Sequence, residues 1–238
     1  ERGLLIADYA RRILALNDEL LARLTAGEAA APFRFGLPES YADYVLPLLL
    51  ADDRRRGVHR IYDVVCDVSP MLLKRVADGE LDVVLAVTPD APAAGAALTW
   101  SEPLCWVGRH DLVGDRGRVL PLLGLAGTCL PRVMAAALAS GGRRYEVVLT
   151  APTLSAVLAL ASHGVGVTVA PRRLIGGAPV LGSAHGLPGL ADLVAGLYVA
   201  GGSGRPTAFT LAAAVAELLG EGELPAPADD RNQGRPGA

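Results

Sequence analysis

The sequence lacks the features that membrane, metal and disulfide-stabilised proteins need. No apolar run approaches the ~18 residues of a membrane-spanning helix, and the chain does not open with the basic and then apolar segments of a secretion signal. Its three cysteines, Cys66, Cys105 and Cys129, are an odd number with no CxxC or Cys/His ligand spacing. We therefore expect free thiols, no zinc or other metal, no cofactor, no membrane partner and a cytoplasmic location. A redox role of these cysteines stays open, because a disulfide needs Cα atoms within ~7 Å.

An excess of positive charge and a catalytic motif are also missing. Lys and Arg number 22 against 25 Asp and Glu, a formal net charge of −3, which argues against a free-standing nucleic-acid binder. The four histidines are scattered, and no Ser/His/Asp order, nucleophile elbow or paired carboxylate motif accompanies them. We expect that the chain is not an enzyme.

The sequence does contain enough apolar residues for one large core or two modest ones, at 51% of 238 residues. Strand-like and helix-like patterns alternate twice along it, on either side of a proline and glycine break at 89–95. The first set predicts strands at 33–37, 61–68 and 81–87, with helices at 41–56 and from Ser69 to Gly79. The second predicts strands at 104–107, 119–125, 145–149 and 165–170, with helices at 131–140 and 153–163, followed by a late strand at 195–200 and a closing helix at 206–219.

These patterns predict an α/β protein of two Rossmann-like, doubly wound lobes. Lobe I is expected to comprise residues 32–102 plus 200–220, and lobe II residues 103–199. The strand at 81–87 is apolar throughout, as expected of a strand buried on both faces. The segment 221–238 is rich in Pro, Gly, Asp and Arg and is expected to be a disordered tail.

The first 28 residues predict an amphipathic helix, and a chain that starts at Glu1 with this helix under way is interpreted as a fragment. Apolar residues recur at alternating spacings of four and three, with one Asn among them, as in a coiled-coil seam. The seam positions are Ile6, Ala10, Ile13, Asn17, Leu20 and Leu24. A linker and dimerisation helix is favoured over a helix that packs on its own domain.

Two serines follow predicted strands at the edge where open α/β sheets bind ligands. Ser40 and Ser69 are each predicted to cap a helix, whose first N–H groups then face a ligand. The alternative is that both serines only cap. Trp100 could stack on a ligand near the crossover between lobes, or only pack at the hinge. Gly164 and Gly166 lack the spacing of a phosphate-binding loop, and tight packing explains them better.

Several segments, taken in order, resemble the LysR-type transcriptional regulators. They are Tyr9-Ala10-Arg11-Arg12, Phe35-Gly36-Leu37-Pro38-Glu39-Ser40, Ser69-Pro70-Met71-Leu72-Leu73, Val76-Ala77-Asp78-Gly79-Glu80-Leu81-Asp82, Ser101-Glu102-Pro103-Leu104 and Gly164-Val165-Gly166-Val167-Thr168-Val169. The resemblance implies a linker helix followed by an effector-binding domain with a periplasmic-binding-protein-like fold of type 2, whose ligand lies between the lobes.

The resemblance also implies partners and site residues. A small polar or anionic effector would contact Ser40, Ser69 and Thr128, with Val165 and Thr168 as looser matches. The chain would form a homodimer or homotetramer and would reach DNA only through a helix-turn-helix that precedes the linker helix. The alternatives are a transport-type solute-binding protein, expected to carry a secretion signal or lipid-attachment cysteine near its start, and more remotely a bilobal α/β enzyme.

Overall fold

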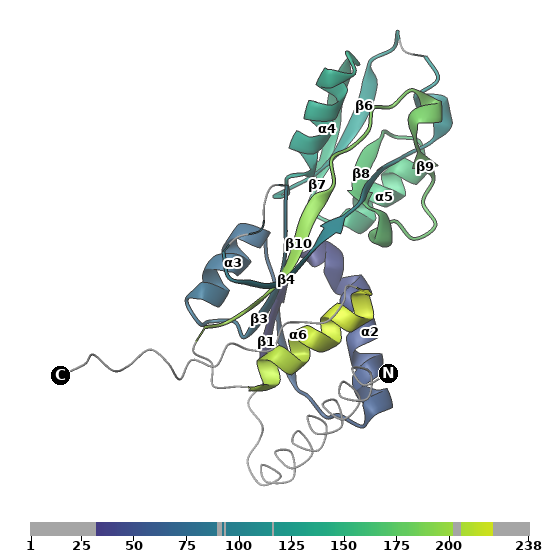
Figure 1. Cartoon of the computed structure of the whole chain (residues 1–238). Coiled ribbons are helices and arrows are strands. Elements are labelled where there is room, and N and C mark those ends of the chain that lie inside the picture. Colours follow the sequence, from purple (N-terminus) through teal and green to yellow (C-terminus); the bar gives the residue numbers. More distant parts are fainter. Residues whose placement is uncertain (1–31, 90–91, 93, 116, 202–205, 221–238) are drawn as a thin grey trace, which may run out of the picture.

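The chain folds into two α/β lobes that are joined by crossing strands (Figure 1). The computed structural model describes residues 32–89, 92, 94–115, 117–201 and 206–220. The predicted linker helix at 1–28 and the predicted tail at 221–238 lie outside the described residues. The dimerisation seam and the disorder of the tail therefore stay predictions.

Lobe I is built on a five-stranded sheet with the order β2-β1-β3-β10-β4. The strands are β1 (Phe33–Leu37), β2 (Tyr62–Cys66), β3 (Val83–Thr88), β4 (Ala96–Glu102) and β10 (Leu193–Val199). Helices α2 (Glu39–Arg56) and α6 (Pro206–Leu219) pack on one face of the sheet, and α3 (Ser69–Ala77) packs on the other (Figure 1).

Strand β3 explains why both faces are covered. Its side chains alternate, so that Val83 and Leu85 join the core beneath α2 and α6 while Val84 and Ala86 join the core beneath α3. A strand that is apolar at every position needs such a layer on each side. The prediction of a strand buried on both faces is confirmed here.

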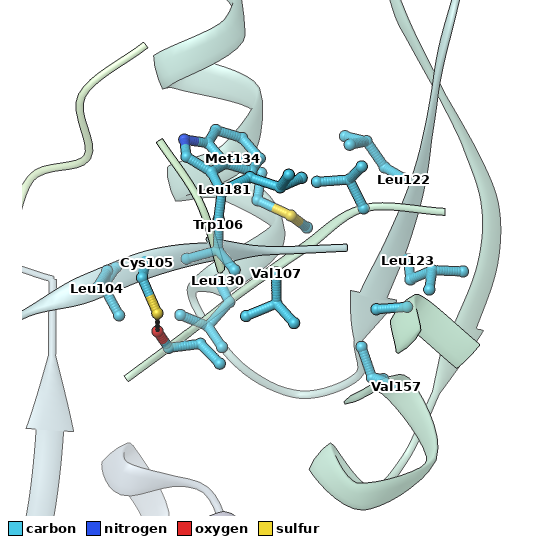
Figure 2. Close-up of a cluster of buried hydrophobic side chains, with 14 of the residues drawn as sticks. Leu104, Cys105, Trp106, Val107, Leu122, Leu123, Leu130, Met134, Val157 and Leu181 are labelled. Carbon is cyan, nitrogen blue, oxygen red and sulfur yellow. Dashed lines mark hydrogen bonds between the residues drawn. The ribbon is translucent and has the colours of Figure 1, made fainter. Parts of the chain in front are cut away.

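Lobe II holds two small sheets, β8-β5-β9 and β6-β7. Its elements are β5 (Leu104–Val107), η1 (His110–Leu112), β6 (Leu120–Leu125), α4 (Leu130–Ser140), β7 (Tyr145–Ala151), α5 (Leu154–Ser162), β8 (Thr168–Pro171), η2 (Arg172–Leu174), β9 (Val180–Leu181) and η3 (Ser183–His185). An isolated bridge between Leu122 and Val167 links the two sheets. Figure 2 shows the core of this lobe, where Trp106 of β5, Leu123 of β6 and Met134 of α4 are brought together.

The strand β10 corrects the predicted boundary of lobe II. Residues 193–199 pair with β3 and β4 in the lobe I sheet, so the prediction that lobe II extends to residue 199 is wrong. The predicted late strand exists, but its backbone pairs with two lobe I strands, and the Pro188-Gly189 pair and Asp192 lie just before its start. The sheet is therefore mixed, because β10 is antiparallel to both of its neighbours.

Strand β4 was missing from the sequence-based prediction. It lies at the edge of the sheet and alternates between half-buried and exposed residues, with Thr99 and Ser101 exposed. An edge strand that buries little apolar surface gives a weak sequence signal. Together β4 and β10 carry the chain into and out of lobe II (Figure 1).

Candidate functional site

The two lobes approach each other at the ends of their parallel strands. The turn that follows β2 meets the turn that follows β6, and a Cβ atom placed on Gly127 would lie only 3.0 Å from Cγ1 of Val68. Gly127 also has a φ of 70°, which favours glycine. The N-termini of α2 and α3 in lobe I and of α4 in lobe II follow these strand ends. This boundary is where an open α/β fold binds its ligand.

A hollow of about 180 Å³ lies between the lobes, which we call the interlobe hollow. Pro89, just after β3, forms its lobe I wall, and the first turns of α4 form the other wall. This second wall consists of Cys129, the N-cap of α4, and of Arg132, Val133 and Ala136. Arg132 is exposed and makes no ion pair with any residue that the structure describes. The hollow therefore presents one available cation beside a helix N-terminus.

Neither predicted serine cap is observed, so both predictions are wrong. Pro38 is the N-cap of α2 and Val68 is the N-cap of α3, and neither cap makes a side-chain hydrogen bond. Both N-cap residues have the extended backbone that is typical of this position, with ψ values of 142° and 146°. Each serine therefore lies inside its helix and not at the cap. Ser40 is the second residue of α2 and Ser69 the first residue of α3.

The two serines have different roles in this arrangement. Oγ of Ser69 accepts a hydrogen bond from the backbone N–H of Val87 at 2.9 Å, which ties the start of α3 to β3. The residue Ser69 is 9% exposed, whereas Ser40 is half-buried. Ser69 is thus part of the scaffold at the boundary, and the effector contact of either serine stays a proposal.

We predict that the two serine-to-alanine variants differ in stability. Ser69→Ala leaves the Val87 N–H without its acceptor and is expected to lower the free energy of unfolding by about 1 kcal/mol. Ser40→Ala removes no capping bond and is expected to change it by less than about 0.5 kcal/mol. Urea unfolding of both variants checks this. Equal losses in the two variants would mean that Ser40 caps α2 after all.

The other predicted contacts fall in different places. Thr128 lies exposed at the lobe boundary, where its Oγ1 donates to the Leu125 carbonyl at 3.0 Å. The structure does not bring Val165 and Thr168 there. Thr168 is 1% exposed and donates to the Leu123 carbonyl at 2.9 Å, and it pairs with Val107 at the end of β5 farther from the boundary. Val165 precedes β8 and is exposed beyond that end.

Trp100 packs within lobe I and does not lie in the interlobe hollow. Its side chain joins the core beneath α2 and α6, and its Nε1–H donates to Oε2 of Glu102 at 3.2 Å. Of the two interpretations given for Trp100, packing near the hinge is the one observed.

A buried ion pair at the crossover was not found from the sequence. Glu102, the last residue of β4, is fully buried, and its Oε1 accepts a hydrogen bond from Nε of Arg173 at 2.8 Å. Nη1 of Arg173 also donates to the Leu219 carbonyl of α6 at 3.2 Å. The pair therefore joins η2, which follows the last long strand of lobe II, to the entry strand and closing helix of lobe I.

The hydroxyl of Tyr41 lies close to this pair. It is buried and has no hydrogen-bond partner among the described residues. Burial and then the charge of Glu102 raise the pKa of Tyr41 well above its ordinary value. Cys129, the N-cap of α4, also raises this pKa to a smaller extent, so the Tyr41 hydroxyl lies near a residue that lines the interlobe hollow.

None of the three cysteines, all of which lie in the described part of the chain, forms a disulfide, and they differ in environment. Cys66 is exposed, Cys105 is buried and Cys129 is half-buried. Partial burial, and then the carboxylates of Glu39 and Asp43, raise the pKa of the Cys66 thiol. These two carboxylates therefore lie near the end of β2, on the lobe I side of the boundary.

The described part of the chain contains no group of three or more His, Cys, Asp or Glu side chains that could hold a metal ion. None of the described helices is both long enough and apolar enough to cross a membrane.

Comparison with known proteins agrees with this architecture. A family model described as the LysR substrate binding domain matches residues 26–223. The HTH-type transcriptional regulator DgdR of Burkholderia cepacia is 31% identical over 157 residues, which cover 66% of this chain and 53% of the relative. PecT of Dickeya dadantii, also an HTH-type transcriptional regulator, is 28% identical over 198 residues, which cover 81% of this chain and 61% of PecT. The chain thus spans between 53% and 61% of the length of these relatives.

Solved structures show the same fold. The reduced form of the regulatory domain of OxyR2 from Vibrio vulnificus has a TM-score of 0.59 at 21% identity, over 79% of this chain and 95% of that domain. The regulatory domain of MexT, a transcriptional activator in Pseudomonas aeruginosa, has a TM-score of 0.58 at 22% identity, over 80% of this chain and 98% of that domain.

Proposed function

Because the chain belongs to the LysR substrate-binding domain family, we propose that it is the effector-sensing portion of a LysR-type transcriptional regulator, with a small anionic effector held in the interlobe hollow. DNA would be contacted by a helix-turn-helix in another part of the protein, and residues 1–28 would join two copies. A cytoplasmic location and the lack of catalysis belong to the same proposal, since the relatives are transcriptional regulators. That similarity also favours this function over transport.

The proposal rests on the positive charge that gathers where the two lobes meet. The first turns of α2, α3 and α4 all lie at the lobe boundary, and each helix start carries roughly half a positive charge. Arg132 adds a full positive charge that no described residue neutralises. Glu39 and Asp43 lie on the opposite side of the boundary, near Cys66. A carboxylate or phosphate group on the α4 side satisfies these donors best.

A thermal-shift screen tests the proposal. The panel contains metabolite carboxylates and phosphates, each with a neutral analogue, and a ligand of the folded state at ~100 times its Kd adds about 2.7 kcal/mol of stability. At least one anion is expected to raise Tm, and its neutral analogue is not. In the Arg132→Gln variant the affinity of that anion is expected to fall about tenfold or more, because a charged hydrogen bond is lost.

Arg172→Gln is the matched control, since Arg172 is also exposed but lies away from the interlobe hollow. Its affinity for the same anion should be unchanged. A panel in which no anion stabilises the chain, or a hit that binds Arg132→Gln as tightly as the unaltered protein, contradicts the proposed site.

A further inference from the structure

A thiol and a guanidinium lie on the same turn at the start of α4. Cys129 is the N-cap of this helix, and the backbone N–H of Arg132, three residues later, donates to the Cys129 carbonyl at 3.0 Å. Side chains at this spacing on a helix are neighbours, with about 5 to 6 Å between their Cβ atoms. Both residues line the interlobe hollow, so one small molecule in the hollow can contact the two side chains together.

The surroundings of Cys129 favour the reactive form of a thiol. Cys129 is half-buried and forms no disulfide. The start of a helix and a nearby guanidinium each stabilise a thiolate, which is the nucleophilic form of cysteine. Arg132 is exposed and makes no ion pair with any residue that the structure describes, so its charge is available both to this thiolate and to a ligand.

Tyr41 supplies another polar group near the thiol. It is only 2% exposed, and its hydroxyl has no hydrogen-bond partner among the described residues. Burial raises the pKa of Tyr41 most, the charge of Glu102 comes next, and Cys129 has a smaller effect in the same direction, so the hydroxyl lies near the thiol. A buried hydroxyl without a partner is costly, and a bound molecule that accepts its hydrogen bond removes that cost.

We propose that the interlobe hollow takes a small α,β-unsaturated carboxylate and that Cys129 adds to it. This step deepens the proposed function and rests on it, because Arg132, the residue proposed to bind the effector, would hold the carboxylate. The paired carboxylate would turn the carbon–carbon double bond toward Sγ of Cys129, which lies on the same helix turn. A second polar group of the ligand would accept the hydrogen bond of Tyr41.

The addition needs no oxidant, leaving group or further reactant. The Cys129 thiolate attacks the β carbon, an S–C bond forms, and the electron pair of the C=C bond moves toward the α carbon and the carboxylate, where Arg132 stabilises the charge. The α carbon then takes up a proton, which balances the proton that the thiol gave to water. The product is a thioether with a saturated carboxylate, which stays in the hollow after the free compound is gone.

The other two cysteines provide an internal comparison. Cys66 is exposed, but partial burial and the carboxylates of Glu39 and Asp43 raise the pKa of its thiol. The same carboxylates repel an anionic compound. Cys105 is buried and is expected to react slowly with any reagent. An anionic electrophile should therefore prefer Cys129, whereas a neutral electrophile should react at Cys66 at least as fast, because Cys66 is more exposed.

The test is incubation of the chain with maleate, followed by peptide mass spectrometry of the three cysteines. Dimethyl maleate is the neutral counterpart, and each rate is divided by the rate of the same compound with glutathione. Maleate is expected to modify Cys129 about tenfold faster than Cys66, and dimethyl maleate is expected to show no such preference. In Arg132→Gln the maleate rate at Cys129 should fall about tenfold, because the charged partner is lost, while the dimethyl maleate rate should change much less.

Arg172→Gln is again the control and should keep the maleate rate of the unaltered chain. The covalent step is ruled out if maleate modifies Cys66 as fast as Cys129, or if Arg132→Gln and the unaltered chain give equal maleate rates at Cys129. If an anion of the thermal-shift panel binds through Arg132 while maleate forms no thioether at Cys129, the covalent step is wrong and the proposed function stands. If neither is observed, both are wrong.

Discussion

Arg173→Met is expected to lower the free energy of unfolding by about 3 to 5 kcal/mol. The substitution leaves the Glu102 carboxylate fully buried with only the Trp100 indole N–H as a donor among the bonds described for it. A buried charge that loses its partner is among the most costly changes in a protein interior. Chemical denaturation at neutral pH measures the loss.

The double variant Glu102→Gln with Arg173→Met is the matched control for this prediction. Because it removes both charges, it should recover a large part of the lost stability. If the single variant loses less than about 1 kcal/mol, the pair behaves as an exposed salt bridge, and the description of a buried pair between the lobes is wrong.

Gly166→Ala is expected to cost about 1 to 3 kcal/mol by overpacking. A Cβ atom at this position would lie 2.9 Å from Cγ of Leu123 and 3.0 Å from the Pro121 carbonyl oxygen. That oxygen cannot retreat easily, since it accepts a hydrogen bond from the Val167 N–H at 2.8 Å. The measurement is the urea midpoint and slope of the variant.

Gly177→Ala provides the comparison, because no atom lies within 4 Å of its added Cβ and its φ is not positive. This control should stay within about 0.5 kcal/mol of the unaltered protein. Equal stability of Gly166→Ala and Gly177→Ala would show that the close approach at Gly166 is absent in solution.

Patterns that are local in sequence were predicted well. The strand β3 was recognised because its apolar run fits only a strand buried on both faces, and the packing interpretation of Gly166 is confirmed by its contacts with β6. The alternation of strands and helices also placed α4, α5 and α6 within about two residues, because each helix has an apolar face and a clear end signal.

Features that depend on distant residues were not predictable in this way. Glu102 and Arg173 are 71 residues apart, and each resembles an ordinary surface charge until the fold buries them together. The serine caps failed for a different reason. Proline and valine adopt the extended cap conformation at positions 38 and 68, so the helices begin without a hydroxyl cap. The boundary at which the chain returns to lobe I likewise depends on the partners of β10 and not on its own sequence.

Alkylation of Cys129 tests most directly whether the effector binds in the interlobe hollow. Cys129 lines that hollow and is half-buried, so iodoacetamide followed by mass spectrometry reports whether the hollow is occupied. With the effector from the screen at saturation, labelling of Cys129 is expected to slow about tenfold, while the same concentration gives little protection in Arg132→Gln. Unchanged labelling of Cys129 at saturating effector would contradict the account and place the effector elsewhere.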